Sequence, residues 1–102
     1  MRGEEGFEGL SGNRVNYQLT FTRKAQQDIA FHKKSGNRIL LNKLLALLEE
    51  LSEHPFAGRG KPEPLKYELT GLWSRRINRE HRIVYEVLGG VVVVHSAAGH
   101  YY

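Results

Sequence analysis

The sequence predicts an α+β domain in which two helices pack on one face of a small, mostly antiparallel sheet, in the order β-α-α-β-β-β-β. Three observations predict this fold. A segment of alternating apolar and polar residues opens the domain, two segments with helical spacing follow, and short alternating runs separated by glycine turns complete it. A chain of 102 residues, 40% apolar and 25% charged, has the size and composition of one globular domain.

The N-terminal residues differ from the rest of the chain. Glycine recurs at positions 3, 6, 9 and 12, and the segment offers little apolar surface to bury, so we expect residues 1–14 to form a disordered tail before a domain spanning 15–102. The chain has no secretory signal, no long apolar run and no cysteine. We therefore expect a cytoplasmic protein that does not enter a membrane.

The first strand and helix are predicted over residues 15–35. Residues 15–21 alternate between apolar and polar side chains, which is the two-residue period of a strand with one buried face. Thr22 can cap a helix over residues 23–34, which contain neither glycine nor proline. Gly36 and Asn37 then supply a helix stop and the cap of a second helix.

The second helix is predicted over residues 38–52. Its leucines form one broad stripe, which indicates packing against the sheet; a dimer seam is the alternative reading of such a stripe. The stripe comprises Leu40, Leu44, Leu47, Leu48 and Leu51, widened by Leu41 and Leu45.

A rigid loop and four short strands are predicted after the helices. His54 precedes a proline, and residues 56–64 contain two glycines and two prolines. Alternating runs follow at 65–69, 73–78, 82–88 and 91–98, with a Gly89-Gly90 hairpin turn between the last two. The face of the sheet away from the helices is polar in pattern and is where we expect a substrate.

Positive charge is concentrated in one part of the chain. Residues 55–82 hold seven basic and three acidic side chains, whereas the remainder holds eight of each. Such a surface suits a polyanion or an acidic protein segment, although a merely solvated basic face is the alternative. The seven bases are Arg59, Lys61, Lys66, Arg75, Arg76, Arg79 and Arg82.

Several residues in and after this region could act on a phosphodiester. Cleavage of RNA without a metal needs a base for the 2′-OH proton, a cation at the phosphorane oxygens and an acid for the departing 5′ oxygen. Glu63, Arg82 and His100 can fill these roles at neutral pH. Alternatively, Glu63 is an ordinary loop acid and His100 is an idle terminal residue. Trp73 is expected in the core rather than as a base-stacking platform.

The strings KPEPL, GLWSRRI and EHRIVY, followed by a terminal HYY, resemble the YoeB/Txe family of bacterial toxins within the RelE-like endoribonuclease superfamily. The resemblance is close over residues 55–101 and looser over 15–54. It implies a ribosome-dependent mRNA interferase that cuts mRNA in the A site and inhibits translation. It also implies Glu63 as general base, Arg82 as phosphorane stabiliser, His100 as general acid and Tyr101 as a substrate-positioning residue.

The same resemblance implies a set of partners. Lys61, Lys66, Arg75 and Arg76 would contact RNA, namely mRNA or the 16S rRNA of the 70S ribosome A site. No metal or cofactor is expected, and the histidines show no metal-ligand spacing. An acidic YefM/Axe-like antitoxin would neutralise the toxin, which in this family is often a homodimer. Two rival interpretations are a non-catalytic interaction protein of the same fold and a general RNA-binding module.

The C-terminal end departs from the family pattern and raises a geometric problem. Ala98 and Gly99 precede His100 where the family commonly has Arg-Tyr or Arg-Gly, and Tyr102 is an extra residue. With a strict two-residue hairpin loop, Arg82 and His100 would lie on opposite faces of the sheet. We therefore expect a three-residue loop, a bulge, or a chain that leaves the strand at Gly99.

Overall fold

The computed structural model describes residues 16–99, so the expected tail over 1–14 and the candidates His100 and Tyr101 lie outside the described residues. The described part has five strands, two α-helices and one turn of 3₁₀ helix. In chain order these are β1 (Gln18–Phe21), α1 (Arg23–Ser35), α2 (Arg38–Leu51), β2 (Glu63–Pro64), η1 (Tyr67–Leu69), β3 (Trp73–Arg76), β4 (Arg82–Leu88) and β5 (Val91–Ser96).

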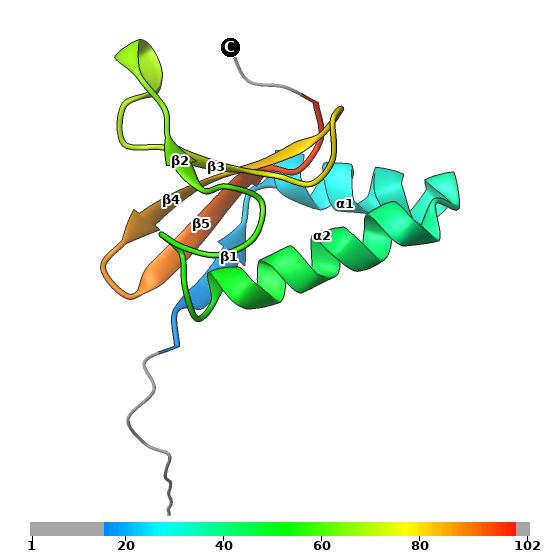
Figure 1. Ribbon diagram of the computed structural model, residues 1–102, viewed down its shortest axis with the longest axis horizontal. Helices are drawn as coiled ribbons and strands as arrows, with labels where there is room; N and C mark the ends of the chain where they lie inside the picture. The colour runs from blue at the N-terminus through cyan, green and yellow to red at the C-terminus, as the bar shows by residue number, and fades with distance from the viewer. Residues whose placement is uncertain (1–15, 100–102) are drawn as a thin grey trace, which may run out of the picture.

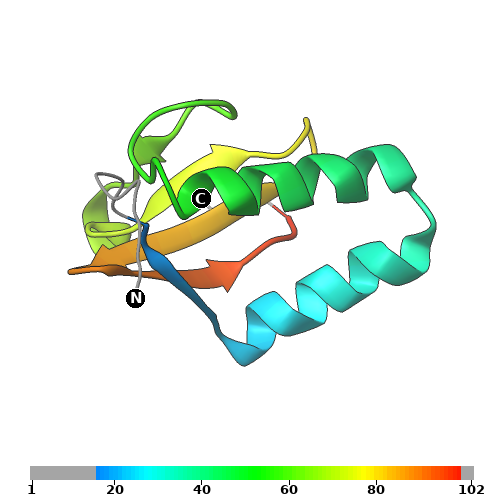
Figure 2. The same cartoon turned by 90° about the horizontal axis from the view of Figure 1, so that it is seen from below.

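The strands form a single sheet in the order β1-β5-β4-β3-β2. Strand β1 pairs with β5 in parallel, and the other three pairings are antiparallel. Both helices lie on one face of this sheet and leave the other face uncovered (Figures 1 and 2). The predicted fold class is confirmed.

The predicted helix ends are also confirmed. The side chain of Thr22 accepts a hydrogen bond from the backbone N–H of Ala25 at 3.1 Å, and the side chain of Asn37 accepts one from Leu40 at 3.0 Å. Between the helices Gly36 adopts a φ of +79°, the left-handed conformation that ends α1. The chain therefore turns sharply and brings the two helices side by side.

The core lies between α2 and the sheet. The leucine stripe of α2 is buried, with Leu44 and Leu51 fully enclosed, and it packs with Ile83 and Tyr85 of β4 and with β5. Burial of each such side chain contributes about 1.5–3 kcal/mol. The stripe is thus core, as predicted, although Leu45 at its edge remains 46% exposed.

Four of the five predicted strands differ from the structure. Those predicted over 73–78 and 91–98 end earlier, at Arg76 and Ser96. The first strand begins at Gln18 rather than at residue 15. The predicted strand over 65–69 is wrong, because Tyr67 has a φ of +59°, which is incompatible with extended backbone. The two-residue strand β2 lies just before that segment, and residues 67–69 form η1, a turn closed by hydrogen bonds from Leu69 N to Lys66 O and from Thr70 N to Tyr67 O.

A bulge of the kind expected lies near the end of β5. Leu88 pairs with Val91, so the Gly89-Gly90 loop has two residues, but the register shifts where Val84 faces Ser96 and the next pair is Tyr85 with Val94. One extra residue in β5 reverses the alternation of side chains beyond it. Of the three expected solutions, the structure shows the bulge and not a three-residue loop.

Candidate active site

A row of side chains crosses the face of the sheet that the helices leave uncovered. The strand register places Glu63 beside Ser74, Ser74 beside Val84, and Val84 beside Ser96. Residues directly opposite each other on paired strands project to the same face. Ile83 and Tyr85, which flank Val84 along β4, belong to the core, so this row faces away from the helices.

Glu63 and Arg82 meet at the end of this row. The Nη1 nitrogen of Arg82 lies 3.2 Å from the Glu63 carboxylate and donates to the Ser74 hydroxyl oxygen at 3.0 Å. The Arg82 side chain is only 11% exposed, whereas that of Glu63 is 57% exposed. The structure therefore places an exposed carboxylate beside a mostly buried guanidinium that is also held by Ser74, and so brings these two candidate residues together.

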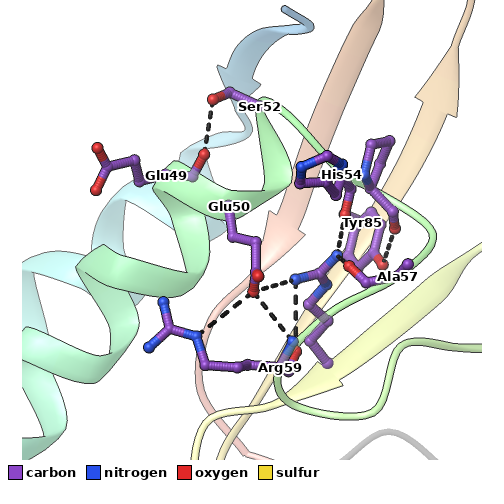
Figure 3. A network of polar contacts seen from close by, with 9 residues as sticks. Glu49, Glu50, Ser52, His54, Ala57, Arg59 and Tyr85 are labelled. Atoms are coloured by element: carbon purple, nitrogen blue, oxygen red, sulfur yellow. Dashed lines mark hydrogen bonds and ion pairs between the residues drawn. The ribbon is translucent and has the colours of Figure 1, made fainter.

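A buried set of polar contacts, here called the loop network, fixes the loop that leads into β2 (Figure 3). Its centre is Arg75, which is fully buried and donates to Glu50 Oε1 at 3.0 Å, to the carbonyl of Ala57 at 2.6 Å and to the carbonyl of His54. Glu50 also accepts from the backbone N–H of Arg59 at 3.1 Å. The predicted RNA contact by Arg75 is wrong, because its guanidinium is enclosed and bound to the loop.

Two further contacts belong to the loop network. The hydroxyl of Tyr85 donates to the carbonyl of Pro55 at 2.6 Å. Burial raises the pKa of Tyr85 above its ordinary value of 10.0, and the neighbouring Arg75 partly opposes that rise. Gly60 accepts from the backbone N–H of Arg76 at 2.7 Å, and a Cβ on Gly60 would lie 2.8 Å from the Arg76 carbonyl oxygen. These contacts hold the loop against the sheet and set the direction in which Glu63 emerges.

A second set of contacts, here called the tail clamp, holds the chain after β5. Asp28 Oδ2 accepts from the backbone N–H of Ala97 at 2.9 Å, and His32 Nε2 faces the carbonyl oxygen of the same residue at 2.8 Å. Two residues later, Gly99 donates to His81 Nδ1 at 2.9 Å. The carbonyl oxygen of Gly99 accepts from the backbone N–H of Arg82 at 3.1 Å. The described chain thus ends fastened to the residue that carries the candidate cation.

The sequence interpretation missed Asp28 and His32. They lie on α1 in register with the fully buried Ala25, at spacings of three and seven residues, so they fall on the stripe of the helix that faces the sheet. Polar residues on a buried helical stripe need a partner, and this signal was available. For His81, which lies in the EHRIVY string, no contact with the chain after β5 was predicted.

The other predicted RNA contacts have the exposure that such contacts need. Lys61, Lys66 and Arg76 are exposed, and Arg76 lies opposite Arg82 in the sheet. Trp73 is half-buried against the core, as predicted. Among the described residues, no group of three or more His, Asp or Glu side chains could hold a metal ion, and no described helix is long and apolar enough to cross a membrane.

Comparison with known proteins shows the family to which this chain belongs. A family model described as the YoeB-like toxin of bacterial type II toxin–antitoxin systems matches residues 21–101. The chain belongs to this family. The match confirms the family resemblance that the KPEPL, GLWSRRI and EHRIVY strings indicated.

Relatives within the YoeB-like family align over almost their whole length. Toxin YoeB of Escherichia coli strain K12 is 37% identical over 84 residues, which cover 82% of this chain and 99% of the relative. The YoeB dimer from Staphylococcus aureus is 36% identical with a TM-score of 0.74, covering 84% of this chain and 99% of that one. A YoeB-YefM complex from Staphylococcus aureus contains a chain 37% identical, with a TM-score of 0.73 and coverage of 83% and 98%.

Proposed function

We propose that this YoeB-like toxin is a ribosome-dependent endoribonuclease that cuts mRNA in the ribosomal A site and thereby inhibits translation. The single observation that carries the proposal is the exposed carboxylate of Glu63 held 3.2 Å from the mostly buried guanidinium of Arg82. A protein that acted only by binding would need the charge of this face but not a proton acceptor paired with a fixed cation.

The proposed reaction is transfer of the phosphoryl group within the RNA. Glu63 removes the proton from a ribose 2′-OH, and the 2′ oxygen forms a bond to the adjacent phosphorus. Arg82 stabilises the negative charge of the resulting phosphorane. The bond to the 5′ oxygen then breaks as His100 donates a proton to it, which leaves a 2′,3′-cyclic phosphate and a 5′-OH. The three side chains supply every proton and charge that this step needs, so the proposed reaction is metal-independent and uses no cofactor.

The tail clamp supports the assignment of His100 as the acid. Gly99 is bonded through its N–H to His81 and through its carbonyl to the backbone of Arg82. The peptide that joins Gly99 to His100 therefore starts beside Arg82, the residue whose side chain would hold the phosphorane. Tyr101, one residue further, is proposed to position the substrate.

The surface charge supports the proposed partners. Lys61, Lys66 and Arg76 are exposed near the Glu63–Arg82 pair and would neutralise phosphates of mRNA or 16S rRNA. The same charge suits the acidic segment of a YefM-like antitoxin, in line with the YoeB-YefM complex among the relatives, and the YoeB dimer supports a homodimer. Because the proposed substrate is mRNA on a translating ribosome, the protein would act in the cytoplasm.

The test is primer extension on a translated mRNA, with and without 70S ribosomes. Cleavage should persist when EDTA is added together with enough magnesium to keep the ribosomes intact, a condition that removes metal ions other than magnesium. We expect Glu63→Gln and His100→Ala each to slow cleavage by about 10²- to 10⁴-fold, the contribution typical of a positioned base or acid. Glu49→Gln, which removes the same charge from an exposed position on α2, should cut as the wild type does. If both site variants still arrest translation and the wild type leaves no cut mRNA, the protein acts by binding and the proposal is wrong.

A further inference from the structure

The most exposed large aromatic side chain described lies next to the candidate site. Tyr67 is 86% exposed and begins η1, the yellow-green turn that projects from the sheet beside β2 in Figure 1. Its carbonyl oxygen accepts from both the backbone N–H and the hydroxyl of Thr70, at 3.0 and 2.7 Å. The ring is therefore presented on a turn whose backbone is fixed, although its φ of +59° is one that tyrosine rarely adopts.

A groove of about 400 Å³ runs along this turn and is lined by residues 63–69. Pro64, Leu65 and Leu69 give it apolar walls, and Glu63 stands at one end. Its volume lies at the small end of the range for ligand sites, roughly 300–1,000 Å³. A solvent-facing ring, apolar walls and the proposed general base thus share one recess.

We propose that Tyr67 and this groove form a subsite for one nucleobase of the RNA, adjacent to the scissile linkage. The inference rests on the proposed function, because a group bound beside Glu63 must be contiguous with the ribose that Glu63 deprotonates. Unpaired bases stack on exposed aromatic rings without regard to sequence. Lys66, the residue before Tyr67, is exposed and supplies the positive charge for the neighbouring phosphate.

The charges of the groove favour a base over an acidic peptide. Both Glu63 and Glu68 line it, and two carboxylates disfavour an acidic antitoxin segment at this position. The flat face of a base carries no net charge and meets no such repulsion. The sequence had suggested Trp73 as the alternative stacking residue, but Trp73 is half-buried against the core, which leaves Tyr67 as the ring available at the groove.

The experiment measures coupling between Tyr67 and individual bases. Programmed 70S ribosomes carry mRNAs in which one nucleotide on either side of the wild-type cleavage position is abasic, and kcat and KM are measured for each. We expect Tyr67→Ala to raise KM by about 5- to 150-fold, the loss typical of one base stacked on an aromatic ring, while kcat changes little. Tyr67→Phe should retain wild-type KM, because stacking needs the ring and not the hydroxyl.

The abasic substrates identify the base. At one flanking position, removal of the base should raise KM for the wild type and have no further effect on Tyr67→Ala. Leu88→Ala, which truncates another exposed apolar side chain at the far hairpin, is the control and should behave as the wild type.

Three results overturn the inference. The first is an unchanged KM for Tyr67→Ala, and the second is an effect of Tyr67→Ala on KM that adds to the effect of every abasic position. The third is a Tyr67→Ala variant that loses only affinity for the purified antitoxin, which would make the groove a protein-docking site. Retained cleavage by Glu63→Gln would contradict the proposed chemistry instead, and the coupling between Tyr67 and the base would still be measured.

Discussion

The loop network and the tail clamp fasten the two ends of the candidate site by different physical means. The loop network depends on the fully buried guanidinium of Arg75, which donates to the Glu50 carboxylate and to the loop carbonyls of His54 and Ala57. The tail clamp distributes its bonds over Asp28, His32 and His81, which hold the backbone of two alternate residues. One end therefore has a single centre, whereas the other has several independent supports.

This difference determines how each end responds to damage. Removal of a buried charged centre leaves several polar groups without partners at the same time, and the costs accumulate. Loss of one member of the tail clamp leaves one backbone group without its bond while the others remain. We therefore expect the Glu63 end to fail as a unit and the Gly99 end to weaken by steps.

Replacement of Arg75 by methionine should have the largest effect on stability. Met fills much of the space of the side chain but leaves Glu50 and the His54 and Ala57 carbonyls without their donor, so we expect the free energy of unfolding in urea to fall by about 3–5 kcal/mol. Arg76→Met is the matched control, since Arg76 is the exposed neighbour on the same strand, and should change stability by about 0.5 kcal/mol or less. Equal effects of the two substitutions would show that the loop network does not hold this region.

Replacement of Asp28 by alanine should have a smaller effect. It removes the acceptor for the buried Ala97 N–H, so we expect a loss of about 1–3 kcal/mol in the free energy of unfolding and faster amide hydrogen exchange at Ala97. Asp28→Asn keeps an oxygen at the acceptor position and should restore most of the protection.

The effect should also stay local. Hydrogen exchange of the loop amide of Arg59, which is bonded to Glu50, should not change in Asp28→Ala. Faster exchange at Arg59 would mean that the two ends of the site are not independent.

The features that the sequence predicted correctly depend on neighbouring residues. Helix caps at Thr22 and Asn37, the leucine stripe and the Gly89-Gly90 hairpin each follow from a few consecutive positions, and all are present. The bulge was one of three alternatives that the sequence left open from the parity of Arg82 and His100. Such patterns are local or follow from simple alternation.

The features that the sequence did not predict depend on pairs far apart in the chain. Arg75 shares the alternation of Trp73, so the pattern places it on the core face, but the partner that binds its charge, Glu50, lies 25 residues away and was not predicted. The strand predicted over 65–69 is wrong because its alternating apolar residues lie instead in a turn, in which Tyr67 has a positive φ. Tertiary contacts override local preference at both places, and both adjoin Glu63.

Replacement of Tyr85 by phenylalanine measures how much one neutral hydrogen bond of the loop network contributes to the free energy of unfolding, apart from the charge of Arg75. Tyr85→Phe keeps the ring in the core but removes the hydroxyl that donates to the Pro55 carbonyl, so we expect a loss of about 1 kcal/mol at pH 7. This is less than for Arg75→Met because only one acceptor loses its donor.

The pH dependence of the same variant tests the cause. Because burial raises the folded pKa of Tyr85 above 10.0, the neutral phenol stabilises the fold fully below pH 10, and this contribution is lost as the pH rises through the folded pKa. The wild type should therefore lose its advantage over Tyr85→Phe above pH 10 in urea unfolding, while other ionisations cancel in the difference. A difference in stability that stays constant to pH 11 would show that the Tyr85 hydroxyl is solvated rather than bonded within the loop network.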